Sequence, residues 1–99
     1  MNRVRLRARL VERSAIRYTP AGLAVTEARF SYDGVLVEAG TERHVEFEFP
    51  AVAVGSVAQS LAAAALGTEV ELDGFLAPAS RRSQRLRIHI TGYQQISGV

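Results

Sequence analysis

Apolar and charged residues alternate strictly at the start of the chain. Between Asn2 and Leu10, arginines at positions 3, 5, 7 and 9 alternate with apolar residues. A period of two places each set on its own face of a β-strand. We predict a strand from Asn2 to Glu12 or Arg13, with a bulge at Leu10–Val11, where two apolar residues are adjacent. The row of arginines needs a neutralising partner, which neighbouring strands, a second chain or phosphates can supply.

Similar patterns predict four further strands, which span residues 23–32, 43–50, 68–76 and 85–96. A phase change at Thr26–Glu27 predicts a second bulge, and Gly74 predicts a sharp bend. The apolar piece Val35–Val37 fits either a hairpin arm or a loop. Thr19–Gly22 is predicted to be a turn, because its proline presets φ and its glycine tolerates positive φ.

One helix is predicted, from Ser56 to Leu66. Ser56 and Gln59 have the spacing of a capping box at the start of this helix. The alanines of this segment favour a helical backbone, and Gly67 is placed to cap the C-terminal end. A helix between the third and fourth of five strands is typical of the OB-fold, an all-β, five-stranded Greek-key barrel. An α/β fold would place helices between most strands. Residues 1–99 are expected to form a single OB-fold domain.

The composition excludes several classes of protein. The chain has no cysteine, so disulfides and thiolate metal sites are impossible. Neither a signal peptide nor an apolar stretch long enough to cross a membrane is visible, so we expect a cytoplasmic protein with no membrane partner. His44 and His89 lack nucleophile or metal-ligand spacing, and no glycine-rich phosphate loop occurs. We therefore predict no enzyme activity, no metal and no cofactor.

The basic residues are unevenly distributed. All twelve are arginines, the net charge is only +2, and the last acidic residue is Asp73. Four arginines follow it without a carboxylate, and this asymmetry favours a polyanionic partner over a merely solvated loop. These arginines lie on the last predicted strand and on the loop before it, where OB-folds commonly contact their ligands. We predict nucleic-acid contacts by the four arginines of this segment: Arg81, Arg82, Arg85 and Arg87.

Aromatic platforms for bases are few. Binders of single strands combine a cationic groove with aromatic rings on which bases stack. Tyr18, beside the predicted turn, and Tyr32, before Asp33–Gly34, are the stacking candidates. Phe75 fits either the core or the groove, and the other three phenylalanines fit the core. His89 is interpreted as an ordinary strand residue, with nucleic-acid contact as the minor alternative.

A resemblance to a known family covers nearly the whole chain. The chain resembles the primosomal replication protein N (PriB) family through an ordered set of short matches. They are Asn2-Arg3-Val4 with Leu6, Pro20-Ala21-Gly22, Glu38-Ala39-Gly40 with Arg43 and Pro50, Gly74-Phe75-Leu76, the basic loop, Ile88-His89 and Ile96. The resemblance implies an OB-fold homodimer in the cytoplasm that binds single-stranded DNA and helps a PriA-type helicase to restart replication. It also implies DNA contacts by Arg81, Arg82 and Arg85, and places Glu46 where relatives carry an exposed aromatic residue.

Two functions from different classes remain open. The first is a single-stranded-DNA-binding accessory protein of the replication-restart primosome. The alternative is an OB-fold protein-interaction module with little or no DNA binding, which Glu46 and the scarcity of exposed aromatics favour. In either case we expect the first strand to be scaffold, with its arginines neutralised by the acidic residues Glu27, Glu69, Glu71 and Asp73. Asn2, Arg3 and Arg5 are predicted to border a dimer interface.

Overall fold

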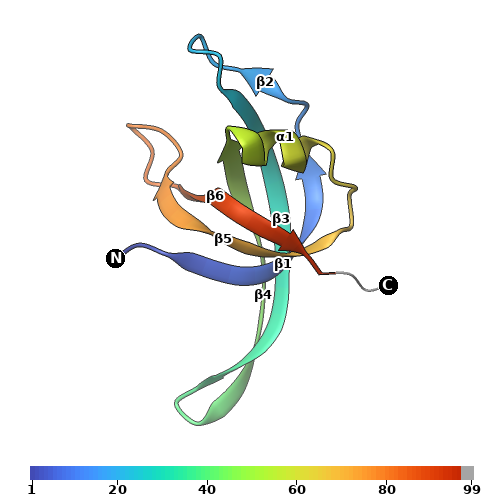
Figure 1. Ribbon diagram of the computed structural model, residues 1–99. Helices are drawn as coiled ribbons and strands as arrows, with labels where there is room; N and C mark the ends of the chain where they lie inside the picture. The colour runs from blue at the N-terminus through green and yellow to red at the C-terminus, as the bar shows by residue number, and fades with distance from the viewer. Residues whose placement is uncertain (97–99) are drawn as a thin grey trace.

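The computed structural model describes residues 1–96, which fold into a strongly twisted sheet that closes on itself (Figure 1). Its elements are β1 (Val4–Arg13), β2 (Arg17–Tyr18), β3 (Ala24–Glu38), β4 (Thr41–Val54), α1 (Ser56–Ala62), β5 (Glu69–Pro78) and β6 (Leu86–Gln95). The strand order is β1-β5-β6-β4-β3, and β1 pairs again with β3 to close the barrel. β4 and β6 are parallel, and the other pairs are antiparallel. The predicted five-stranded barrel with one helix is confirmed. β2, a short addition to β3, was not predicted.

The core lies inside the barrel, where one face of every long strand contributes. Phe30 and Phe49 face each other across β3 and β4, with ring centroids 5.8 Å apart. They pack with the inward side of β1, β5 and β6 and with Ala58 and Leu61 of α1. The helix therefore covers one end of the barrel (Figure 1). Among the described residues, no helix is long and apolar enough to cross a membrane.

β3 and β4 form a hairpin that extends well beyond the barrel (Figure 1). Their pairing is continuous from Val25↔Val54 to Glu38↔Thr41, so Val35–Val37 is a hairpin arm rather than a loop. Ala39 and Gly40 form the turn, with φ of 53° and 78°. Positive φ at both central residues gives the turn that matches the twist of paired strands. The strands predicted over residues 23–32 and 43–50 are therefore longer in the structure, and β3 continues through Asp33–Gly34.

The expected bulge at Thr26–Glu27 is wrong. The register with β4 does not shift there. The phase only seemed to change, because Val25 is buried on the outer side of the sheet while polar Thr26 is buried on the inner side. The Thr26 hydroxyl donates a hydrogen bond of 2.8 Å to the carbonyl of Ala58, so the buried polar group is satisfied.

The bulge predicted at Leu10–Val11 is confirmed, and at Gly74, where a sharp bend was predicted, the pairing with β6 has a bulge. The pairing of β1 with β3 shifts register between Leu10 and Glu12, which leaves Val11 as the extra residue. The pairing of β5 with β6 shifts between Asp73 and Gly74, where Thr91 is the extra residue. At Gly74 the backbone of His89 comes so close that a Cβ atom would clash with its carbonyl oxygen. Gly74 is therefore a position where only a missing side chain allows the strands to approach.

The predicted caps of the helix are wrong. Gly55, with φ of 87°, is the N-cap, and no side chain caps the helix, so Ser56 and Gln59 form no capping box. The helix ends at Ala62, four residues earlier than expected. Gly67 does not cap it, because its N–H donates a 2.7 Å hydrogen bond to the carbonyl of Leu10. That bond directs the chain back to β1, beside which β5 begins.

Candidate nucleic-acid interface

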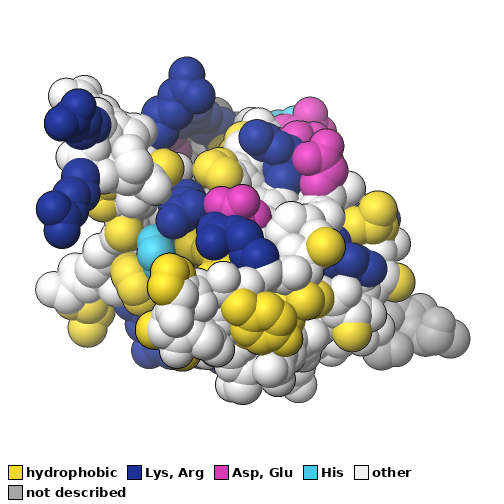
Figure 2. Space-filling model, turned by 90° about the horizontal axis from the view of Figure 1, so that it is seen from above, with side chains coloured by type: hydrophobic (Ala, Val, Ile, Leu, Met, Phe, Trp, Pro, Cys, Tyr) yellow, Lys and Arg dark blue, Asp and Glu magenta, His cyan; other side chains and the backbone are white. Residues whose placement is uncertain are grey.

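The loop between β5 and β6 presents three exposed arginines. Its base is closed by a hydrogen bond of 2.9 Å from the N–H of Ala79 to the carbonyl of Arg85. Arg81, Arg82 and Arg85 are all exposed, and within residues 1–96 none of them forms an ion pair. Figure 2 shows dark-blue side chains on the left side of the molecule, which carries this loop in Figure 1. Unpaired guanidinium groups on a tight loop can bind phosphates without first breaking an internal contact.

Arg87 differs from the loop arginines, because it already has a partner. It lies on the outer face of β6, where its side chain is only 23% exposed. Its Nη1 lies 3.3 Å from Oε1 of Glu27, and Arg17 approaches the same carboxylate to 3.9 Å. The Nε atom of Arg87 is buried without a hydrogen-bond partner in the described residues. Glu27 thus holds Arg87 in place and neutralises part of its charge.

Next to Arg87 two rings are stacked on the outer face. Phe75 of β5 and His89 of β6 are cross-strand partners, with centroids 4.9 Å apart and planes inclined by 14°. Phe75 is 37% exposed. Burial, and secondarily Arg87, lowers the pKa of His89 below its ordinary value, which favours the neutral ring. The pair therefore forms a flat, uncharged platform that a nucleobase can cover.

This platform was missed by the sequence reasoning. The alternation of Arg87 and His89 placed both on one face of their strand, and Phe75 was left open between core and groove. What the sequence lacked was the register that sets Phe75 directly opposite His89. That register depends on the bulge at Thr91 and on the close approach at Gly74.

The outer face continues from the platform across β4 and β3. Val52 of β4 is paired with His89 of β6 on one side and with Glu27 of β3 on the other. Val52 and Val25 are buried, yet neither belongs to the core inside the barrel. We call this surface the outer face; its residues are Phe75, His89, Arg87, Val52, Glu27, Val25 and Arg17. On this face the exposed ring of Phe75 lies near arginines, and single-strand binders combine aromatic rings with positive charge in this way.

The two tyrosines predicted as stacking candidates do not lie on this outer face. Tyr18 is 61% exposed, but its partner on β3 is the inward residue Ala24, whereas Arg17 pairs with outward Val25. Tyr18 therefore projects from the opposite side of its ribbon. Tyr32 packs against the core, and its ring lies 5.4 Å from that of Phe47. Tyr32 acts as a packing residue at the start of the hairpin arm.

The arginine row of β1 is neutralised within the sheet. β5 lies beside it, and Arg5, Arg7 and Arg9 face Asp73, Glu71 and Glu69 in the register. Arg3 reaches Asp73 at 2.8 Å and Arg5 reaches Glu71 at 3.0 Å, while the other two pairs are 3.9 Å long. The hydrogen bond from Arg3 holds the pKa of Asp73 below its usual range. The scaffold role expected for β1 is thus supported by carboxylates of β5.

The prediction that Glu27 neutralises the arginine row of β1 is wrong. Glu27 serves Arg17 and Arg87 instead, because β1 pairs with β3 only from Arg9 onward.

The residues predicted at a dimer interface are engaged within the chain. The Asn2 amide donates to the carbonyl of Leu76 at 2.7 Å and accepts from its N–H at 3.0 Å, so it extends the β1–β5 ladder. Arg3 and Arg5 form the ion pairs described above. Along Val4–Ala8, however, β1 has a strand partner on one side only within the described residues. This free edge is where a second chain could pair.

Comparison with known proteins agrees with this architecture. Residues 2–92 match a family model described as another single-strand binding protein family. The chain is 43% identical over 98 residues to the replication restart protein PriB of Bordetella pertussis, covering 99% of this chain and 92% of the relative. It is 36% identical to PriB of Nitrosomonas europaea, covering 90% and 82%.

Solved structures show the same likeness. PriB from Ralstonia solanacearum superposes with a TM-score of 0.89 at 41% identity, covering 98% of this chain and 99% of that one. The single-stranded DNA binding protein of Thermus aquaticus shares the fold, with a TM-score of 0.77 at 22% identity, covering 99% of this chain and 51% of that one. The chain therefore belongs to the replication restart protein PriB family.

Proposed function

We propose that this protein binds single-stranded DNA without sequence preference, as a cytoplasmic accessory protein of the replication-restart primosome. It acts by binding rather than by catalysis, as one OB-fold domain, and it assists a PriA-type helicase in loading the replication machinery. Membership of the PriB family and the match to a single-strand binding family support this role. The observation that carries it is the juxtaposition of an acid-free arginine loop with the exposed Phe75–His89 platform.

The mechanism divides the work between charge and stacking. Arg81, Arg82 and Arg85 attract the phosphates and hold the backbone, which gives affinity without sequence selectivity. A base that is free of a complementary strand stacks on the Phe75–His89 platform. Arg87 lies between loop and platform, where a phosphate competes with Glu27 for its guanidinium group. A duplex keeps its bases stacked inside, so only a single strand can use both parts.

We also propose that the protein works as a homodimer. The free edge of β1 along Val4–Ala8 offers backbone groups to the same edge of a second chain. Asn2, Arg3 and Arg5 border that edge, and their contacts with β5 order the side chains there. Two chains joined in this way would present two loops and two platforms to one DNA strand.

An alternative function is a protein-interaction module that binds little DNA. The outward positions of β4 favour it, because Glu46 and Glu48 are exposed there and repel phosphates. This alternative predicts no measurable difference between single strands and duplexes. The binding proposal predicts a clear preference for single strands.

The expected preference can be measured by fluorescence anisotropy. A labelled oligothymidylate should bind more tightly than a duplex of the same length. Phe75→Ala should weaken single-strand binding by about 1–3 kcal/mol, roughly 5- to 150-fold, because a stacked base loses its platform. Phe75→Tyr keeps the ring and is the matched control, expected to bind like the wild type. Absence of single-strand binding would argue for the alternative, whereas equal binding of strand and duplex, or an unchanged affinity of Phe75→Ala, would contradict the role of the platform.

A further inference from the structure

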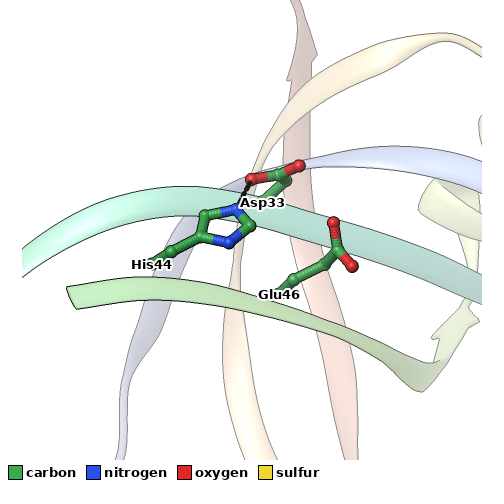
Figure 3. Close-up of side chains that lie close together, drawn as sticks. All are labelled: Asp33, His44 and Glu46. Atoms are coloured by element: carbon green, nitrogen blue, oxygen red, sulfur yellow. Dashed lines mark hydrogen bonds and ion pairs between the residues drawn. The ribbon is translucent and has the colours of Figure 1, made fainter.

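Three potential metal ligands meet on the hairpin arm, away from the residues assigned to DNA. Asp33 of β3 lies directly opposite Glu46 of β4, and His44 lies two residues before Glu46 on the same strand. Alternation along the strands puts all three on one side of the ribbon. Figure 3 shows them converging, Asp33 from one strand and His44 and Glu46 from the other. The sequence spacing of the histidines gave no such sign, because Asp33 joins the other two only through the register of the hairpin.

The distances suit a single bound ion. Nε2 of His44 lies 2.6 Å from Oδ1 of Asp33, and one ligand atom of each residue lies within 4.8 Å of the others. In a tetrahedral zinc site with bonds of about 2.0–2.2 Å, ligand atoms are about 3.3 Å apart. The His44–Asp33 contact must therefore open by about 0.7 Å, and a pair at the 4.8 Å limit must close by about 1.5 Å, through side-chain rotations on a fixed backbone. The continuous ladder of β3 and β4 holds that backbone.

The local charge is unbalanced without a cation. Glu48 and Glu38 of the same hairpin have arginine partners, Arg29 and Arg43, whereas exposed Glu42 has none within residues 1–96. Asp33 pairs only with His44, and Glu46 forms no ion pair within residues 1–96. Two carboxylates thus share one imidazole. A divalent ion bound between Asp33 and Glu46 would balance both negative charges.

We propose that Asp33, His44 and Glu46 bind one divalent transition-metal ion, with zinc as the best match. An imidazole nitrogen and two carboxylate oxygens form a three-ligand set that zinc accepts, and a water molecule completes the tetrahedron. The ion takes the lone pair of Nε2, so the proton shared between His44 and Asp33 passes to solvent. Magnesium is a poor substitute, because it prefers six oxygen ligands and rarely uses an imidazole.

Isothermal titration calorimetry with zinc chloride on the tag-free 99-residue chain tests this proposal. We expect one zinc ion per chain, a zinc-dependent rise in melting temperature, and no competition from excess magnesium. His44→Ala should weaken zinc binding by more than about tenfold, because loss of even an outer-shell partner costs roughly 10–100-fold. Glu46→Gln should also weaken it, which provides a second variant if the first folds poorly.

Glu42→Gln is the matched control. It removes an exposed carboxylate from the same side of β4, two residues before His44 and outside the cluster. This variant should bind zinc like the wild type. The proposal is overturned if the wild type binds no zinc, if His44→Ala and Glu46→Gln bind it unchanged, or if Glu42→Gln loses as much affinity as they do.

Discussion

Replacing Arg81, Arg82 and Arg85 together by alanine is expected to abolish most binding of single-stranded DNA while leaving the fold intact. The three side chains are exposed and make no ion pair within residues 1–96, so the folded state depends little on them. Each is placed to neutralise a phosphate, and each phosphate contributes about 0.7 to the slope of log K against log salt for single strands. The triple variant should therefore bind far more weakly, with a slope smaller by about 2 for each chain that contacts the strand. Anisotropy of a labelled oligothymidylate measures both effects.

The matched control changes two arginines of β1. Arg5→Ala with Arg7→Ala removes the same kind of charge from a row that Glu71 already neutralises. This variant should mainly loosen the fold or the dimer and should leave DNA contact by each loop in place, because its arginines are engaged with carboxylates in the wild type. If the β1 variant lost DNA binding and the loop variant kept it, the DNA site would have to be moved to β1.

Replacing Gly74 by alanine is expected to cost about 1–3 kcal/mol of folding free energy, as overpacking of a closely packed position does. The added Cβ would collide with the carbonyl of His89 and lie 3.2 Å from Cα of Ile90. Both are backbone atoms, so β5 and β6 must separate where the Phe75–His89 platform is built. For a domain of this size the melting temperature should fall by roughly 5–20 °C. Thermal unfolding followed by circular dichroism measures the loss.

Gly92→Ala provides the control for this prediction. Gly92 lies on β6 opposite Asp73, close to the same bulge, but no atom lies within 4 Å of where its Cβ would be. Its substitution should change the stability by no more than about 0.5 kcal/mol. Similar melting temperatures for the two variants would contradict the close approach assigned to Gly74.

The barrel could be predicted from the sequence because its signals are local. Alternation along β1, β5 and β6 follows directly from burial on one face, and the bulge at Leu10–Val11 shows as two adjacent apolar residues. The bulge expected at Thr26–Glu27 was wrong for a reason that cannot be read from the neighbouring residues in the sequence. Val25 is buried on the outer side of the sheet, apart from the core inside the barrel. The hydroxyl of Thr26 donates its hydrogen bond to the carbonyl of Ala58 in the helix. Both depend on residues distant in the sequence.

The candidate interface also has a part that could be predicted from the sequence and a part that could not. Arg81, Arg82 and Arg85 were visible as a basic stretch without acids, and the structure leaves them exposed on a loop. Phe75 and His89 become a platform only through cross-strand register, and Asp33 joins His44 by the same means. Tyr32 looked exposed beside Asp33–Gly34, but the strand continues through that pair and turns its ring toward Phe47. Register, rather than composition, limits what the sequence tells about the site.

The salt dependence of wild-type binding tests the central claim most directly. If phosphates are held by the arginine loop, log K for an oligothymidylate should fall linearly with log salt. The slope should be about −2 to −3 for each chain that contacts the strand, which corresponds to three or four neutralised phosphates per chain. Fluorescence anisotropy across a series of salt concentrations provides this measurement. Absence of binding at micromolar protein, or an affinity that does not change with salt, would contradict the account.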